Sequence, residues 1–210
     1  MTDSGLIWEA LSRERERVVT RRRIVELANR IDLNAESAIR TLSNTNRIMP
    51  LFKGFYYLRD PSEILLNAPT SPLDLFALGA KAKGIGTWYY GLDTALRLNG
   101  MTHEHRNDEL VVSDNLYRPH GITMAGRRFV VLKWRPSLTR FGVKRKGNYS
   151  WSDPEKTVLD FAYHDHYSLS KGRAATGIWR EHLHTINRPR LRAYLAHYPA
   201  AVADMIEGAP

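Results

Sequence analysis

Residues 20–58 read TRRRIVELANRIDLNAESAIRTLSNTNRIMPLFKGFYYL, and this stretch decides the fold of the first part of the chain. Thr20 is a suitable N-cap for a helix from residue 21 to residue 30, whose apolar face consists of Ile24, Leu27 and Ala28. Residues 31–33 predict a tight turn. Asn34 then caps a second helix that continues to about Asn46.

Two short apolar and aromatic runs follow, at residues 47–52 and 55–58, on either side of Lys53-Gly54. This pattern predicts a β-hairpin, and Pro50 indicates that its first strand lies at a sheet edge. Before Thr20, a short amphipathic helix is predicted from Ile7, Trp8, Leu11 and Val18. Three helices followed by a hairpin is the order of a winged helix-turn-helix.

The second helix of that motif has one polar face, because Ser37, Arg40, Thr41 and Asn44 follow the i, i+3, i+4, i+7 spacing. The opposite face, with Ala38, Ile39 and Leu42, is predicted to point inward. Arg and Asn suit bidentate contacts with guanine and adenine in a major groove about 12 Å wide. We therefore expect Arg40, Thr41 and Asn44 to contact base edges. The alternative is a helical hairpin whose polar face is only solvated.

Contacts with DNA phosphates are expected at the start of the first helix of this motif, on the polar face of the second helix and at the hairpin turn. Ser37 is placed near a phosphate by its position on the polar face, and Arg21 and Arg22 by their position at the helix start. Lys53 lies at the hairpin turn. Each such cation releases condensed counterions from DNA, so these three residues are expected to strengthen binding to any sequence.

The overall composition favours a polyanionic partner. The 210 residues include 31 Lys and Arg against 22 Asp and Glu, which gives a net charge of +9. The chain has no Cys, which excludes disulfide scaffolds, thiolate metal sites and cysteine nucleophiles. No signal peptide is recognisable, and no apolar run approaches the roughly 20 residues of a membrane-spanning helix. We therefore expect a cytoplasmic protein without a membrane partner.

The chain is predicted to have α+β structure in two domains. Residues 1–60 form the winged helix-turn-helix, residues 61–70 a linker, and residues 71–210 a domain with a small sheet and C-terminal helices. Within the linker, the apolar triplet at 64–66 is expected to dock onto one of the domains. In the second domain, helices are predicted to start near Ser71, at Gly91 and at Pro154, and strands are predicted at 88–90, 110–112, 129–134 and 149–151.

Two segments of the second domain carry a resemblance to a known family. They are TWYYGLDTAL at 87–96 with NGMT at 99–102, and SDPEKTVLD at 152–160. Over most of residues 15–165 the chain resembles the AbiEi-type antitoxins, the repressor partners of nucleotidyltransferase toxins in AbiE systems. The resemblance implies an N-terminal domain that binds the operator of its own operon and a C-terminal domain that neutralises the toxin. It implies no catalytic residue and no cofactor.

A strongly basic segment spans residues 115–152, which contain nine Lys or Arg and no Asp or Glu. Lys144, Arg145 and Lys146 precede Gly147, and we expect them in a turn from which their charges reach outward. Such a surface suits DNA phosphates or an acidic face of a partner protein. The alternative is a solvated hairpin.

Three histidine pairs at i, i+2 spacing are the remaining anomaly: His103 and His105, His164 and His166, and His182 and His184. On a strand such a pair suits a metal, but the last two pairs lie in helical sequence, where their side chains diverge. Surface or capping histidines are therefore expected, and no metal site is predicted.

Enzymatic signatures are absent from the sequence. There is no phosphate-binding Gly-x-x-x-x-Gly-Lys-Ser/Thr loop and no nucleophile elbow. The cluster Asp153, Glu155 and Lys156 superficially resembles a nuclease motif, but Asp153-Pro154 is better explained as a helix cap. A non-enzymatic DNA-binding repressor is predicted. Two alternatives stay open: a metal-dependent nuclease that uses the His pairs with Asp165, and a winged-helix adaptor that binds a protein and no DNA.

Overall fold

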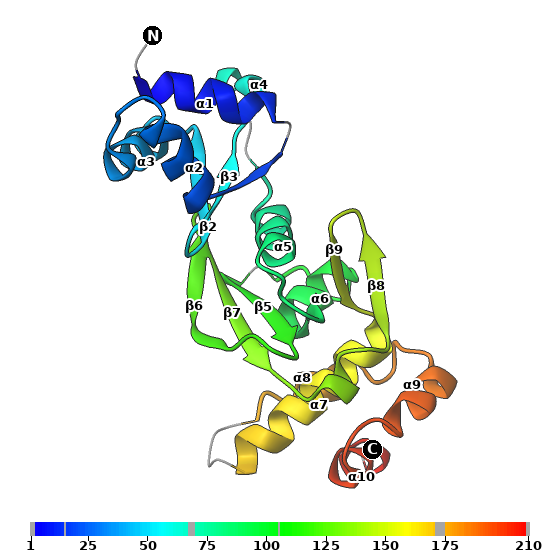
Figure 1. Cartoon of the computed structure of the whole chain (residues 1–210). Helices are drawn as coiled ribbons and strands as arrows, with labels where there is room; N and C mark the ends of the chain where they lie inside the picture. The colour runs from blue at the N-terminus through cyan, green and yellow to red at the C-terminus, as the bar shows by residue number, and fades with distance from the viewer. Residues whose placement is uncertain (1–2, 15, 67–69, 105, 171–174, 209–210) are drawn as a thin grey trace. The chain divides into compact units, whose positions relative to one another are not determined.

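The computed structural model describes residues 3–14, 16–66, 70–104, 106–170 and 175–208, and it divides into two compact units (Figure 1). Unit 1 comprises residues 1–85 and 123–127, and unit 2 comprises residues 86–122 and 128–210. The described residues form ten α-helices and two sheets, which confirms a mixed α and β architecture. None of the described helices has both the length and the apolar character needed to cross a membrane.

Unit 1 begins with three helices: α1 (Asp3–Arg13), α2 (Arg21–Asn29) and α3 (Ala35–Asn44). Both predicted N-caps are confirmed. The Thr20 hydroxyl accepts a hydrogen bond from the Arg23 N–H at 3.1 Å, and the Asn34 side chain accepts one from the Ser37 N–H at 3.0 Å. The predicted turn is also present, with Asp32 at φ 51°. These caps satisfy N–H groups that have no partner within their own helix.

A three-stranded antiparallel sheet of order β1-β3-β2 completes this part of unit 1. Its strands are β1 (Val18–Thr20), β2 (Ile48–Phe52) and β3 (Phe55–Leu58). The predicted hairpin and the edge position of Pro50 are confirmed. Val18, predicted in the first helix, lies instead in β1 opposite Tyr57. Pairing with β3 holds the backbone at Val18 in an extended conformation, which suits a β-branched residue. The local periodicity of the sequence does not indicate this pairing.

The predicted linker contains a short helix, α4 (Pro61–Leu65), which starts with a capping box between Asp60 and Glu63. Leu65 is 85% exposed and Leu66 74% exposed, so the expected docking of this triplet is wrong for both residues. Residues 67–69 lie outside the described part of the chain.

Helix α5 (Pro72–Ala82) starts near Ser71 as predicted, the Ser71 side chain caps it, and the helix belongs to unit 1 rather than to unit 2. It packs on the first sheet, where the rings of Phe76 and Phe52 meet edge to face at 5.7 Å. Gly79 permits this contact, because a Cβ there would lie 2.9 Å from the Phe52 ring. Unit 1 therefore includes residues 61–85 in addition to residues 123–127.

Unit 2 is built on a six-stranded mixed sheet of order β6-β7-β5-β4-β9-β8. The strands are β4 (Trp88–Tyr90), β5 (Asp108–Ser113), β6 (Arg118–Met124), β7 (Arg127–Lys133), β8 (Val143–Lys146) and β9 (Tyr149–Ser152). Pairs β5–β7 and β4–β9 are parallel, whereas β4–β5 and β8–β9 are antiparallel. Four of these strands were predicted, and β6 and β8 were not.

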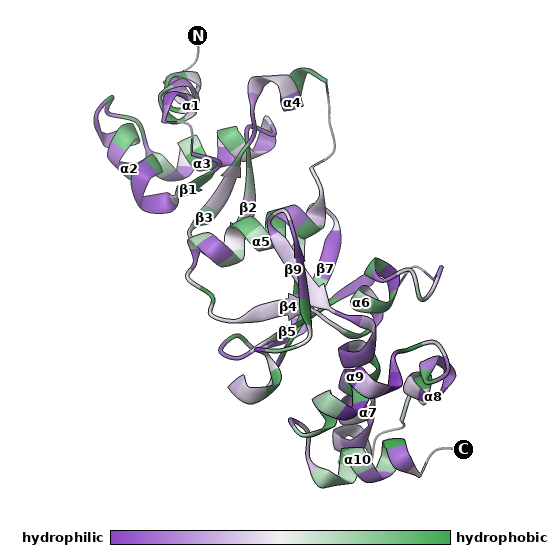
Figure 2. Cartoon of the chain, turned by 90° about the vertical axis from the view of Figure 1, so that its right-hand side faces the viewer, coloured by the Kyte–Doolittle hydropathy of each residue, from purple (hydrophilic) through white to green (hydrophobic). Residues whose placement is uncertain are grey.

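The helices of unit 2 are α6 (Leu92–Leu98), α7 (Pro154–Ser170), α8 (Ile178–His182), α9 (Arg188–Leu195) and α10 (Ala200–Glu207). Helices α8, α9 and α10 lie beside α7 (Figure 2). Their apolar faces close one core around Val158, Phe161 and Trp179. The predicted helix starts at Gly91 and Pro154 are confirmed.

A polar network lies inside this core. Lys156 and Asp160, one turn apart on α7, are both 0% exposed, and the Lys156 Nζ donates to the Asp160 Oδ1 at 2.9 Å. The hydroxyls of Tyr89 and Tyr198 donate to the same carboxylate at 2.9 and 2.6 Å. Burial lowers the pKa of Lys156 and raises the pKa of Asp160. The Asp160 carboxylate thereby links α7 to β4 through Tyr89 and to the segment between α9 and α10 through Tyr198.

Candidate nucleic-acid interface

The exposed face of α3 contains all four residues predicted for it. Ser37, Arg40, Thr41 and Asn44 are exposed, whereas Ala38 and Leu42 are buried and Ile39 is half-buried. Among the described residues, the Arg40 side chain has no ion-pair or hydrogen-bond partner. Its guanidinium is therefore available to a ligand outside the chain.

The arginines at the start of α2 are paired with carboxylates of the same unit. Arg21 forms an ion pair with Glu36, and the Arg22 Nε donates to Glu26 at 3.0 Å. These contacts raise the pKa of Arg21 and lower the pKa of Glu26. The predicted phosphate contacts Arg21 and Arg22 are thus partly neutralised. Residues 1–85 contain 13 Lys and Arg against 10 Asp and Glu, so unit 1 holds little of the chain's positive excess.

Lys53 occupies the turn between β2 and β3, as predicted, and is exposed. Gly54 beside it adopts φ 82°, a conformation that glycine tolerates. The Arg21 N–H donates to the Gly54 carbonyl at 2.8 Å, which ties this turn to the start of α2. The fold thus brings together two of the predicted phosphate contacts, Lys53 and Arg21, that are far apart in the sequence.

The segment 144–146 differs from the prediction. Lys144, Arg145 and Lys146 lie in β8 rather than in a turn, and the turn itself is Gly147-Asn148. Their β9 partners are Trp151, Ser150 and Tyr149, respectively. Because side chains alternate along a strand, Lys144 and Lys146 share one face and Arg145 lies on the other. The three cations therefore do not form one phosphate-binding cluster.

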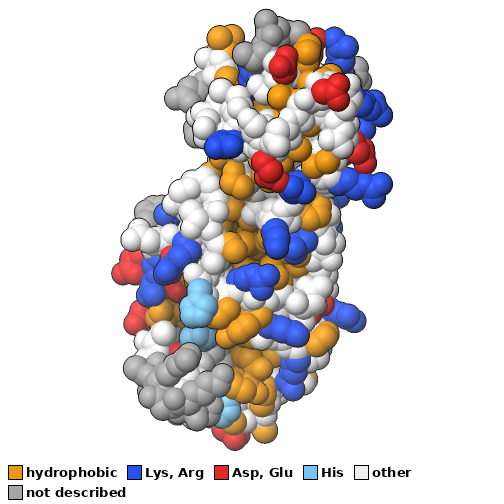
Figure 3. All heavy atoms as spheres, turned by 60° about the vertical axis from the view of Figure 1, so that its left-hand side comes forward, with side chains coloured by type: hydrophobic (Ala, Val, Ile, Leu, Met, Phe, Trp, Pro, Cys, Tyr) orange, Lys and Arg blue, Asp and Glu red, His pale blue; other side chains and the backbone are white. Residues whose placement is uncertain are grey.

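Other cations of the basic segment are engaged locally. The Arg128 Nε donates to Asp108 on the neighbouring strand at 2.7 Å, and Arg135 donates to the His197 carbonyl at 3.0 Å. On the face shown in Figure 3, Lys and Arg side chains stand among uncharged ones, with Asp and Glu side chains fewer beside them.

The histidine pairs do not assemble a metal site in the described part of the chain, where no group of three or more His, Asp or Glu could hold an ion. His105 lies outside the described residues. Asp165, assigned to the nuclease alternative, is buried and accepts hydrogen bonds from the Thr176 N–H at 2.8 Å and the Gly177 N–H at 2.9 Å. Its carboxylate therefore stabilises the start of α8.

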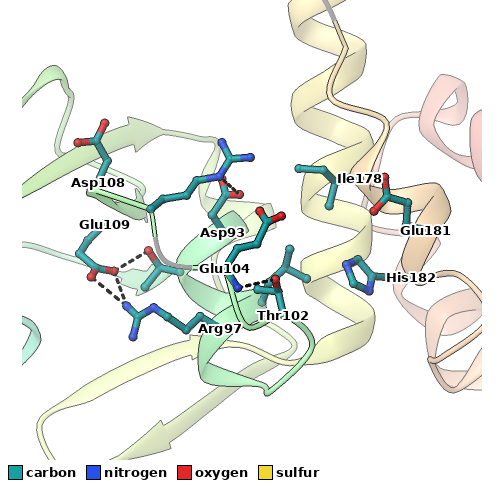
Figure 4. Close-up of a pocket in the computed structure, with 12 residues that line it drawn as sticks. Asp93, Arg97, Thr102, Glu104, Asp108, Glu109, Ile178, Glu181 and His182 are labelled. Carbon is teal, nitrogen blue, oxygen red and sulfur yellow. Dashed lines mark hydrogen bonds and ion pairs between the residues drawn. The ribbon is translucent and has the colours of Figure 1, made fainter.

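A small cavity of about 140 Å³ lies in unit 2 between α6, β5 and α8 (Figure 4). The buried Glu109 carboxylate accepts from Arg97 at 2.7 Å and from the Thr94 hydroxyl at 2.9 Å. Across the cavity, Arg106 pairs with Asp93 at 2.9 Å, and burial raises the pKa of Asp93. These contacts pair two cations of the wall with two carboxylates, and Glu104, Glu181 and His182 also line the cavity.

No family model and no curated protein matches this sequence. The structure is similar to the crystal structure of the RV2827C protein from Mycobacterium tuberculosis, with a TM-score of 0.64 and 14% sequence identity. The match covers 100% of this chain and 76% of that chain. At this identity the likeness shows the fold alone.

Sequence reasoning missed the alternation of side chains in the β8–β9 hairpin. The stretch VKRKGNYSWS at 143–152 contains a signal for it, because Gly147-Asn148 is a favourable two-residue hairpin turn between alternating segments. This signal pairs Lys144 with Trp151 and Lys146 with Tyr149. The run of three cations alone did not reveal that pairing.

Proposed function

We propose that the chain is a sequence-specific double-stranded DNA-binding protein whose residues 3–58 form a winged helix-turn-helix. In this proposal α3 enters the major groove, and the turn between β2 and β3 contacts the sugar–phosphate backbone. The observation that carries it is the exposed α3 face with Arg40, Thr41 and Asn44. Glu36, one turn before Arg40 on the same helix, is paired with Arg21. Arg and Asn can read guanine and adenine edges from the α3 face.

The ion pairs at the start of α2 are compatible with this role. Arg21 and Arg22 are exposed, and exposed ion pairs contribute only about 0–1 kcal/mol. A phosphate can therefore replace Glu36 or Glu26 at small cost. Lys53 needs no such exchange, and it is the strongest candidate for a phosphate contact in unit 1.

We further propose, from the family resemblance, that the DNA is the operator of the chain's own operon and that unit 2 counteracts a nucleotidyltransferase-type toxin. The two segments that carry the resemblance, within residues 87–102 and 152–160, are joined by hydrogen bonds. Asn99 donates to the Ser152 carbonyl at 2.8 Å, and Tyr89 reaches Asp160. The motifs thus join β4, α6, β9 and α7 into one platform, which is a suitable frame for a protein partner.

Gel-shift titration with the duplex upstream of the operon and with a scrambled duplex of equal length tests the DNA assignment. Arg40→Ala is expected to remove about 1–3 kcal/mol of discrimination, a 5- to 150-fold loss on the operator, with little loss on the scrambled duplex. Arg192→Ala, on the exposed face of α9, is the matched control for charge. Equal losses on both duplexes would show that Arg40 contacts only phosphates. Unchanged binding would contradict the placement of α3 in the major groove.

Co-expression with an adjacent nucleotidyltransferase gene tests the antitoxin assignment separately. Growth rescue by the full chain is expected. Operator binding without rescue would withdraw the antitoxin assignment and leave the DNA-binding one intact.

A further inference from the structure

The β8–β9 hairpin has one face on which lysines and aromatic rings alternate. Lys144 lies opposite Trp151, and Lys146 lies opposite Tyr149. Residues directly opposite each other in an antiparallel pair project to the same side of a sheet. We call these four residues the lysine–aromatic face. Both lysines are exposed, and both rings are partly exposed.

The rings of this face rest on a buried aromatic neighbour. The Tyr149 ring lies 5.6 Å from the ring of Tyr90, which is fully buried, and 6.1 Å from the ring of Trp151. Tyr90 also pairs with Trp151 across the parallel β4–β9 ladder. Tyr149 therefore packs against a buried ring on one side and lies beside the Trp151 ring on the other.

Asn99, the C-cap residue of α6, contacts both the indole of Trp151 and the ammonium group of Lys144. Its side-chain oxygen accepts from the Trp151 Nε1 at 3.1 Å and from the Lys144 Nζ at 3.1 Å, while its Nδ2 donates to the Ser152 carbonyl at 2.8 Å. One amide thus holds an indole and an ammonium group side by side. A site that is ordered before binding loses less conformational entropy when a ligand arrives.

We propose that the lysine–aromatic face binds single-stranded nucleic acid. Tyr149 and Trp151 stack with unpaired bases, and Lys144 and Lys146 contact the adjoining phosphates. Aromatic rings beside cations are the arrangement that single strands require, because every base has a π-face that a duplex keeps hidden in its own stack. The surrounding segment 115–152 has no acidic residue to repel a polyanion. This inference does not rest on the function proposed for unit 1.

Fluorescence anisotropy of the full chain with labelled 12-nucleotide oligo(dT), oligo(rU) and a duplex of equal length tests the proposal. Both single strands are expected to bind more tightly than the duplex. Tyr149→Leu is expected to weaken single-strand binding about 5- to 150-fold, the range for loss of one stacked base. Lys146→Ala is expected to reduce the slope of log K against log salt by about 0.7.

The hairpin contains its own matched control. Arg145 lies in the same strand with the same charge but on the opposite face, so Arg145→Ala is expected to change single-strand affinity less than threefold. Equal losses for Arg145→Ala and Lys146→Ala would reduce the effect to general electrostatics and overturn the proposal. So would tighter binding to the duplex.

A second pair of variants separates stacking from folding. Trp151→Phe retains an aromatic face but loses the hydrogen bond to Asn99, whereas Trp151→Leu loses the ring. Single-strand binding is expected to be retained by the first and lost by the second, with unchanged circular dichroism in both. Equal binding by the two variants would overturn the stacking role. Operator binding through α3 is measured in the same proteins, so failure of one assignment is distinguishable from failure of the other.

Discussion

The two units differ in that unit 2 has a fully buried ion pair, whereas the ion pairs described for unit 1 are exposed or half-buried. In unit 1 the ion pairs lie on the surface, as between Arg21 and Glu36 and between Arg22 and Glu26, and the core is apolar around Ile24, Leu42 and Ile48. In unit 2 the pair of Lys156 with Asp160 lies inside the core. Surface pairs can exchange one partner for a ligand at little cost, whereas a buried pair cannot. The exposed pairs of Arg21 and Arg22 are therefore candidates for binding, and the buried pair of Lys156 with Asp160 is a structural element.

Lys156→Met tests whether the buried ion pair stabilises unit 2, and it has the largest expected effect. The substitution leaves the Asp160 carboxylate buried without its counter-charge, and we expect a loss of about 3–5 kcal/mol in the free energy of unfolding. Hydrogen exchange measured by mass spectrometry assigns the loss to a unit. Protection is expected to fall in α7, β4 and the C-terminal helices, and to persist in α2 and α3.

Arg22→Met is the matched control for Lys156→Met, because it removes one partner from an exposed pair. A change below about 1 kcal/mol is expected. If both variants lost the same stability, burial would not be the property that separates the two units.

Gly79→Val tests whether α5 belongs to unit 1. A Cβ at this position would lie 2.9 Å from the Phe52 ring and 3.1 Å from the Leu51 Cβ, so we expect overpacking to cost about 1–3 kcal/mol. Increased exchange in β2 and β3 would place the damage in unit 1. Lys81→Ala, at an exposed position of the same helix, is expected to leave exchange unchanged. Loss of protection confined to residues 86–122 would contradict the boundary at Ile85.

The smallest expected effect concerns acid titration. In unit 1, hydrogen bonds from Arg22 and Arg23 hold the pKa of Glu26 below its ordinary 4.5. The stabilisation from Glu26 is therefore complete above pH 4.5 and is lost as the pH falls through its folded pKa. In unit 2, burial raises the pKa of Asp93 and Asp153 above the ordinary 3.8. The cost of their ionisation is present at neutral pH and is relieved as the pH falls towards 3.8.

Carbon-13 NMR titration of the side-chain carboxyls measures this difference directly. The midpoint of Glu26 is expected below 4.5, and the midpoints of Asp93 and Asp153 above 3.8. Arg22→Ala, which removes the largest cause of the shift, is expected to move the Glu26 midpoint upward. The same Glu26 midpoint in Arg22→Ala as in the unchanged chain would show that the surface pair is not formed in solution.

Local signals predicted much of the fold. Thr20 and Asn34 were recognised as caps because each places a side-chain oxygen where a helix start leaves free N–H groups. The polar face of α3 followed from helical periodicity, and the exposure of Ser37 and Arg40 agrees with it. Such features depend on residues within about four positions of each other, so the sequence displays them directly.

The errors concern interactions between distant segments. Strand β1 is extended because it pairs with β3, in the register Val18 with Tyr57. Helix α5 belongs to unit 1 because it covers the first sheet through Phe76 and Gly79. The sequence around Val18 does not indicate its pairing with Tyr57, and the sequence around Phe76 does not indicate its contact with Phe52.

The sequence by itself determined which helix faces are apolar, where the helices begin and which residues of α3 are exposed, because capping and periodicity act over a single helical turn. Only the tertiary structure decided which charges are free. Arg40 and Arg21 look alike in the sequence, yet Arg21 pairs with Glu36 from the next helix. Lys156 follows Asp153 and Glu155 in a charged segment that is typical of a protein surface. In the structure it is buried with Asp160, in contact with Tyr89 and Tyr198. Pairing and burial depend on distances in space, and these are set when separate elements pack.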